Sequence, residues 1–206
     1  AQLGGISVMD PVTETFKRYR FDASNPAGLS HIASRTVFED RDGRIWVGTD
    51  DGLDRMDEGR EGTFEHFKHD TTDVASLSHS DVNAIYQDAA GFLWVATRQG
   101  LNRVDPRDPA AGFQRFLTDE RGLEGLFERD EVPGILWVGA WSGLIRLDVE
   151  SGESERFEID NPELSRYGVG AISHDPTNRN VLWVDIRRGV ARFDLRSRLF
   201  LPYGSD

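Results

Sequence analysis

Apolar and polar residues between positions 82 and 105 alternate in short runs that glycine-containing turns separate. These runs predict strands at 82–87, 92–97 and 101–105, joined by turns at 88–91 and 98–100. In the middle strand Leu93 and Val95 point to one side, while Trp94 and Ala96 point to the other. Because both sides are apolar, we expect this strand to be covered on both faces.

The same pattern recurs along the chain in a fixed order. A tryptophan follows an aliphatic residue and precedes valine at Trp46, Trp94, Trp137 and Trp183, with spacings of 48, 43 and 46 residues. Six residues after each tryptophan comes a glycine (Gly52, Gly100, Gly143 and Gly189), and eleven residues after it comes an aspartate (Asp57, Asp105, Asp148 and Asp194). We interpret this register as an internal repeat.

Four complete units and one half unit account for most of the chain. The half unit covers 4–22, and the complete units cover about 35–70, 81–119, 122–160 and 167–203. Each complete unit predicts four antiparallel strands in about 45 residues, which is typical of a β-propeller blade. We therefore expect an all-β chain with little helix, in which residues 1–206 form a single propeller segment. Each repeat tryptophan should then lie between neighbouring blades, where its burial stabilises the fold by about 2–3 kcal/mol.

The repeated glycines and acidic residues have a structural interpretation. The glycine of each unit closes the second hairpin, where we expect a positive φ. An aspartate also precedes each first turn, at Asp40, Asp88, Asp130 and Asp175. Such residues bind nearby backbone N–H groups in Asx turns. We favour this role over a ring of carboxylates that binds a cation.

Composition narrows the function classes. With 38% hydrophobic and 29% charged residues in 206 positions, the chain is typical of a globular protein. The net charge of −12 and the lack of a basic block argue against nucleic-acid binding. No run of eighteen apolar residues occurs, so we expect no membrane contact within this segment. Because the sequence has no cysteine, it has no thiolate catalysis, thiolate metal site or disulfide.

The units have the form V-x-A-I-x-x-D-x-x-G-x-L-W-V-G-T-x-x-G-L-x-R-x-D…G-x-F, most closely in 82–113 and 37–64. This pattern resembles the two-component regulator propeller repeat. The resemblance implies the sensing part of a bacterial signal-transduction protein, on the periplasmic or extracellular side of a membrane-anchored chain. It also implies carbohydrate, such as an oligosaccharide, as the ligand class, and a kinase, cyclase or DNA-binding output elsewhere.

The number of units is smaller than this family usually has. The half unit supplies strands three and four of a blade, but no spare strands one and two follow the last unit. We therefore expect a partial propeller, either a fragment of a larger ring or a ring completed by another chain. Open blade edges favour self-association.

The turns between the second and third strands differ most between units. They contain Asp50–Asp51, Arg98–Gln99, Trp141–Ser142 and Arg187–Arg188. Trp141 is the one tryptophan of five outside the repeat position. A tryptophan can stack on a sugar, while guanidinium and amide donors bind hydroxyl groups. We therefore predict ligand binding by Trp141, Arg98, Gln99, Arg187 and Arg188. The alternative is that Trp141 only packs on the neighbouring loop.

Two other function classes stay open at this point. A propeller lyase or hydrolase needs an acid and a base at the central opening, where the first strands offer mainly Ser80, Asn83, Tyr86, Glu128 and His174. We expect no catalytic residue, metal site or cofactor, and we expect the histidines (31, 66, 69, 79 and 174) at the surface. A protein-interaction scaffold is the other alternative, since fold alone does not decide function.

Overall fold

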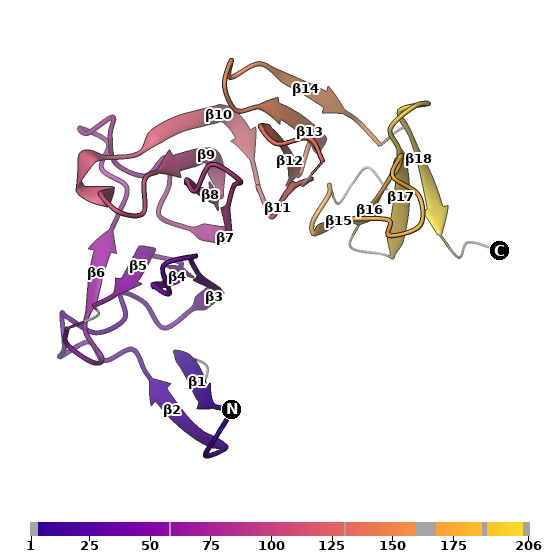
Figure 1. Ribbon diagram of the computed structural model, residues 1–206. Helices are drawn as coiled ribbons and strands as arrows, with labels where there is room; N and C mark the ends of the chain where they lie inside the picture. The colour runs from indigo at the N-terminus through magenta and orange to yellow at the C-terminus, as the bar shows by residue number, and fades with distance from the viewer. Residues whose placement is uncertain (1–3, 58, 130, 160–167, 187–188, 204–206) are drawn as a thin grey trace.

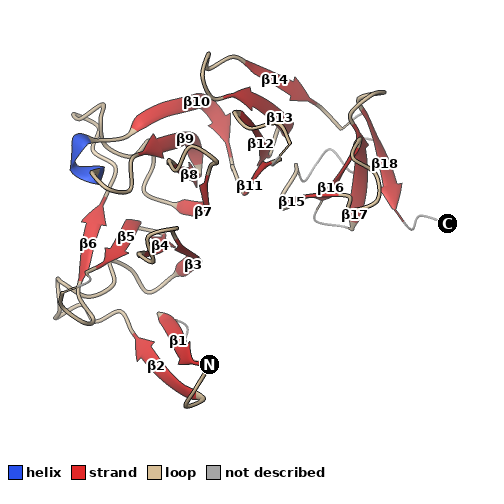
Figure 2. Ribbon diagram, in the orientation of Figure 1, coloured by secondary structure: helices blue, strands red, loops and turns tan. Residues whose placement is uncertain are grey.

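The computed structural model describes residues 4–57, 59–129, 131–159, 168–186 and 189–203. In this part of the chain it contains four four-stranded antiparallel sheets, one two-stranded sheet and one turn of 3₁₀-helix at Pro109–Ala111. The sheets follow one another along an open arc, with the N-terminal and C-terminal sheets at its two ends (Figure 1, Figure 2). The expected all-β partial propeller is confirmed.

Each sheet comes from one continuous stretch of chain. The half unit forms β1 (Ile6–Asp10) and β2 (Thr15–Tyr19). The next sheet contains β3 (Ser34–Glu39), β4 (Ile45–Thr49), β5 (Gly52–Met56) and β6 (Phe64–Phe67). It is followed by β7 (Val82–Gln87), β8 (Leu93–Thr97), β9 (Gln99–Val104) and β10 (Gln114–Arg121). The third full sheet contains β11 (Gly125–Glu128), β12 (Ile135–Ala140), β13 (Gly143–Asp148) and β14 (Ser154–Phe157). The last contains β15 (Ile172–His174), β16 (Val181–Asp185), β17 (Val190–Asp194) and β18 (Leu199–Tyr203).

Strand order within each sheet follows chain order, which is the arrangement of a propeller blade. Two strands differ from the predicted bounds: β8 begins at Leu93 rather than at Phe92, and β9 begins at Gln99 and ends at Val104 rather than spanning 101–105. β9 begins earlier because Gln99 pairs with Arg121 of β10, which extends the strand toward the turn. The repeat glycines have positive φ values, as expected: 128° at Gly52, 85° at Gly100, 131° at Gly143 and 147° at Gly189.

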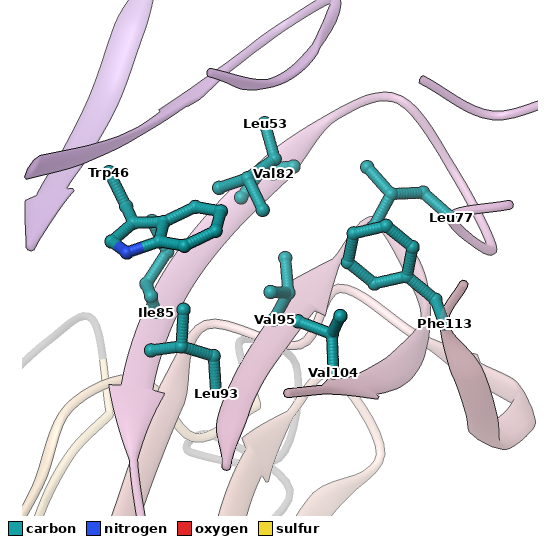
Figure 3. Packing of buried hydrophobic residues seen from close by; sticks show 9 residues of the cluster. All are labelled: Trp46, Leu53, Leu77, Val82, Ile85, Leu93, Val95, Val104 and Phe113. Atoms are coloured by element: carbon teal, nitrogen blue, oxygen red, sulfur yellow. The ribbon is translucent and has the colours of Figure 1, made fainter. Parts of the chain in front are cut away.

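Tryptophans of the repeat lie between successive blades. Trp46 is fully buried in a cluster with Leu77 of the connecting loop and with Val82, Ile85 and Leu93 of the next unit (Figure 3). Trp94 is buried in the same way against Leu136, Val138 and Ile145, and Trp137 against Leu182, Val184 and Phe193. Trp183 has no following blade in this chain; it is half-buried and contacts Tyr203, with ring centroids 5.2 Å apart. The expected packing between blades is confirmed for the first three.

Aspartates before the first turn bind these tryptophans. The indole N–H of Trp46 donates to Asp40 at 2.9 Å, and that of Trp94 donates to Asp88 at 2.7 Å. The indole N–H of Trp183 donates to Asp175 at 3.1 Å. Asp40 also accepts backbone N–H groups of Asp42 and Arg44, which is the Asx-type turn that the sequence predicts. Asp130 lies outside the described residues. Each of the three carboxylates thus joins a turn to a tryptophan.

Candidate functional site

The first three turns between second and third strands lie beside the loops that connect blades. In each of these turns a backbone N–H donates to a backbone carbonyl in the loop, or at the end of the strand, beside it. The N–H of Asp50 donates to Ala33 at 3.2 Å, that of Arg98 to Asp81 at 2.9 Å, and that of Trp141 to Arg121 at 3.2 Å. We call the surface that these turns form the turn face. Arg187 and Arg188, which were predicted to belong to it, lie outside the described residues.

Trp141 is the large apolar side chain of the turn face. Its side chain is half exposed, and the residue as a whole is 48% accessible. The indole Nε1 donates to Oε1 of Glu124 at 3.3 Å. One edge of the ring lies directly against Gly122, where a Cβ atom would come within 2.1 Å of Nε1. Gly122 has a φ of 59°, which favours glycine, so the backbone there suits the close approach of the indole.

Arg98 and Gln99 lie on the neighbouring blade. The carbonyl of Arg98 accepts the backbone N–H of Gly122 at 2.8 Å, so Arg98 and Trp141 both contact that glycine. The guanidinium of Arg98 is 3.5 Å from the carboxylate of Asp81 and is largely exposed. Gln99 turns back instead, because its side-chain amide donates to the carbonyl of Thr118 at 3.4 Å. The structure therefore brings Arg98 close to Trp141, whereas Gln99 is engaged by its own blade.

Sequence reasoning missed the acidic residues of this face. Glu124 binds the indole of Trp141, and Asp81 faces Arg98. The hydrogen bond to Asp50 raises the pKa of Arg35, and the charges of Asp81 and Glu124 act in the same direction. Glu124 and Asp81 precede first strands, so their position just before β7 and β11 was the available signal. A half-exposed indole beside one carboxylate, with an exposed guanidinium on the neighbouring blade, can stack on a ring and bind its hydroxyl groups.

Residues near the inner strands have structural partners. Glu128 is buried and accepts the backbone N–H groups of Ala89 and Gly134 at 2.7 and 2.6 Å. Asn83 donates to the carbonyl of Leu123, and the exposed His174 stacks on Phe127 with centroids 5.9 Å apart. Within the described ranges, no three histidine, cysteine or carboxylate side chains gather as metal ligands. These contacts offer no acid and base pair.

The expectation of surface histidines is wrong for His31, His66, His69 and His79, which are half-buried, whereas His174 is exposed. His66 Nδ1 lies 2.7 Å from Oδ1 of the fully buried Asp54, and its Nε2 lies 3.1 Å from the carbonyl of Pro26. His69 is also half-buried, with Nδ1 2.6 Å from the carbonyl of Leu77. Both side chains fasten a loop between blades. The reason is that Asp54 and the loop carbonyls need hydrogen-bond partners once the blades pack.

Geometry and topology together define an open β-propeller of sequential four-stranded blades. Residues 28–51 and 76–99 match the model of the two component regulator propeller family. The resemblance expected from the sequence is confirmed. No curated protein sequence matches the chain, and no helix in the described part has the length and apolar character needed to cross a bilayer.

Solved structures share the fold at low identity. The extracellular domain of the hybrid two component system BT3049 from B. thetaiotaomicron superposes with a TM-score of 0.74 and 19% identity over 97% of this chain. The extracellular domain of BT4673 from the same organism superposes with a TM-score of 0.66 and 18% identity over 98% of this chain. The chain spans only 27% and 35% of those domains. Virginiamycin B lyase from Staphylococcus aureus is also similar, with a TM-score of 0.70 and 17% identity, covering 98% of this chain and 63% of the lyase. At these identities the likeness concerns the fold alone.

Proposed function

We propose that this chain is a non-catalytic, ligand-sensing propeller segment of a bacterial signal-transduction protein, and that it works on the extracytoplasmic side of the membrane. The matched repeats and the likeness to extracellular domains of hybrid two component systems support this proposal. The ligand is a carbohydrate that contacts the turn face at Trp141.

Trp141 is the observation that carries the proposal. A residue that only filled a gap between loops would bury its ring, yet this residue is 48% accessible. Its one hydrogen-bond donor points to Glu124, which leaves the ring face for stacking. Arg98 and Asp81, on the adjacent blade, supply donors and acceptors for hydroxyl groups beside it.

Oligosaccharide binding to Trp141→Ala tests the proposal. A panel of oligosaccharides is screened against the wild-type chain, and binders are measured by calorimetry. Trp141→Ala should abolish binding without lowering the melting temperature, because the ring is half exposed. Tyr203→Ala is the matched control, since Tyr203 is an exposed aromatic on a different sheet and should bind as the wild type does. Unchanged binding by Trp141→Ala contradicts the proposal.

A further inference from the structure

An arginine recurs in the third strand of every full blade, beside the repeat tryptophan. In register, Arg55 pairs with Trp46, Arg103 with Trp94, Arg146 with Trp137, and Arg192 with Trp183. The fourth strand places Glu65, Gln114, Glu155 and Leu201 opposite these arginines. Three of the four blades thus offer each guanidinium an acceptor on the adjacent strand.

In two blades that acceptor is used. Arg55 donates to Glu65 at 2.5 Å and lies over the ring of Trp46. Arg103 donates to Gln114 at 2.7 Å and to the carbonyl of Val149, on the next blade, at 3.2 Å. Both guanidinium groups are therefore satisfied by the protein itself.

In the β11–β14 blade the acceptor is taken by another residue. Arg198, in the turn between β17 and β18, donates to Glu155 at 2.5 Å. Arg146, the register partner of Glu155, has no hydrogen bond or ion pair within the described ranges. Nearby, Nε of Arg129 is buried and has no hydrogen-bond partner, while its Nη2 lies 3.5 Å from a carboxylate oxygen of Glu131. Two guanidinium groups thus keep free donors at the junction of two blades, in a chain with a net charge of −12.

These donors line a groove of about 410 Å³. Its aromatic walls are Trp137, Phe157 and Phe193, and its polar groups are Arg129, Arg146, Arg198 and Glu155. The turns that contribute Arg129 and Arg198 lie at the opposite end of the strands from the turn that holds Trp141. The groove is therefore separate from the turn face. Its volume falls in the range of small-molecule sites.

We propose that this groove binds a small organic carboxylate with a flat, apolar body. A planar guanidinium matches a carboxylate with two parallel hydrogen bonds, which favours a planar anion over a neutral molecule. The aromatic walls favour a ring. The free donors of Arg146 hold the carboxylate, while the body of the ligand lies against the half-buried Phe157.

Titration calorimetry with benzoate, 4-hydroxybenzoate and indole-3-carboxylate tests this assignment. At least one acid should bind saturably, and its neutral carboxamide should bind at least about tenfold more weakly. Arg146→Met, which keeps an unbranched apolar stem and removes the guanidinium, should weaken binding by about tenfold or more. Arg179→Met is the control for loss of a nearby positive charge, because its side chain is 82% exposed and lies outside the groove; it should leave binding unchanged.

Glu155→Gln provides a test of opposite sign. It removes the carboxylate of Glu155, which lines the groove, so the acid should bind more tightly than to the wild type. Because the Glu155–Arg198 pair is partly exposed, its loss should not unfold the chain. If Arg146→Met melts early, the acid–carboxamide comparison and Glu155→Gln decide the question. Absence of binding by all three acids, or equal binding of acid and carboxamide, overturns the proposal. Trp141→Ala should not change acid binding in this groove, so failure of the groove proposal can be told apart from failure of the proposed carbohydrate binding.

Discussion

Trp94 donates its indole N–H to Asp88 at 2.7 Å, and both residues are almost completely buried. The same carboxylate accepts the backbone N–H of Phe92 at 2.9 Å. One side chain therefore satisfies the turn between β7 and β8 and fixes the orientation of the ring that fills the junction with the next blade. Turn geometry and packing between blades depend on the same residue.

Asp88→Ala should destabilise the chain by about 2–4 kcal/mol, because it leaves the indole of Trp94 and the amide of Phe92 buried without an acceptor. Urea unfolding followed by tryptophan fluorescence measures this loss. Asp88→Asn should recover part of it, since the amide oxygen can still accept. Asp175→Ala is the comparison in the last blade, where Trp183 is half-buried, and its effect should be smaller. Equal losses at both positions would contradict this account.

Gly122→Ala should move the indole of Trp141. The new methyl group would lie 2.1 Å from Nε1, and the φ of 59° adds backbone strain. We expect a shifted Trp141 emission spectrum and weaker oligosaccharide binding at the turn face. Gly91→Ala serves as the control because it also has a positive φ, 95°, but open space around its Cβ position. An unchanged Trp141 signal in Gly122→Ala would show that the close contact is absent in solution.

Acid should destabilise the blades through their turn aspartates. Burial of Asp40 by itself would raise its pKa, but hydrogen bonds from Trp46 and Arg44 outweigh burial and hold the pKa below its ordinary value of 3.8. A carboxyl whose pKa is lower in the folded chain stabilises it above the unfolded value. That contribution is lost as the pH falls through 3.8 and below. Backbone and hydroxyl hydrogen bonds lower the pKa of Asp70 and Asp175 in the same direction.

Urea midpoints measured between neutral pH and about pH 3 test this dependence. Asp40→Asn should be less stable at neutral pH and should show a shallower fall in acid, because one of the titrating carboxyl groups is gone. Acid also reduces the repulsion that comes from the net charge of −12, and this effect is common to both proteins. Parallel profiles for the wild type and Asp40→Asn would rule out Asp40 as a contributor.

Self-association through open blade faces stays a prediction, and the last blade is where we expect it. Leu201 occupies the register position that holds Glu65 or Glu155 in other blades, and Leu199, Leu201 and Tyr203 are 44–68% exposed. Leu201→Glu should reduce association of the 206-residue chain in sedimentation measurements, because a charge opposes apolar burial. A wild type that stays monomeric at high concentration would contradict the prediction.

The fold could be predicted from the periodic residues, whereas the side-chain contacts between blades could not. The tryptophan, glycine and aspartate spacings are local, and they indicated the four-stranded units and their order. The Asp–Trp bonds were not foreseen, because their spacing is six residues for Trp94 but eight for Trp183. The groove was missed because it depends on Arg198 reaching Glu155 across 43 positions. Trp141 was singled out because it departs from the repeat, and its role in ligand binding stays a prediction. Glu124 was not singled out, although it directly precedes the first strand of its blade.

The order of packing has a consequence for unfolding. Each tryptophan-centred cluster joins one blade to the next along the chain, and among the described residues no such cluster joins blades that are distant in the chain. The β15–β18 sheet, whose Trp183 is half-buried, has such a junction on one side only within this chain. Amide protons of that sheet should therefore exchange with solvent before those of β7–β9. Unfolding should begin at this terminal blade and proceed inward one blade at a time.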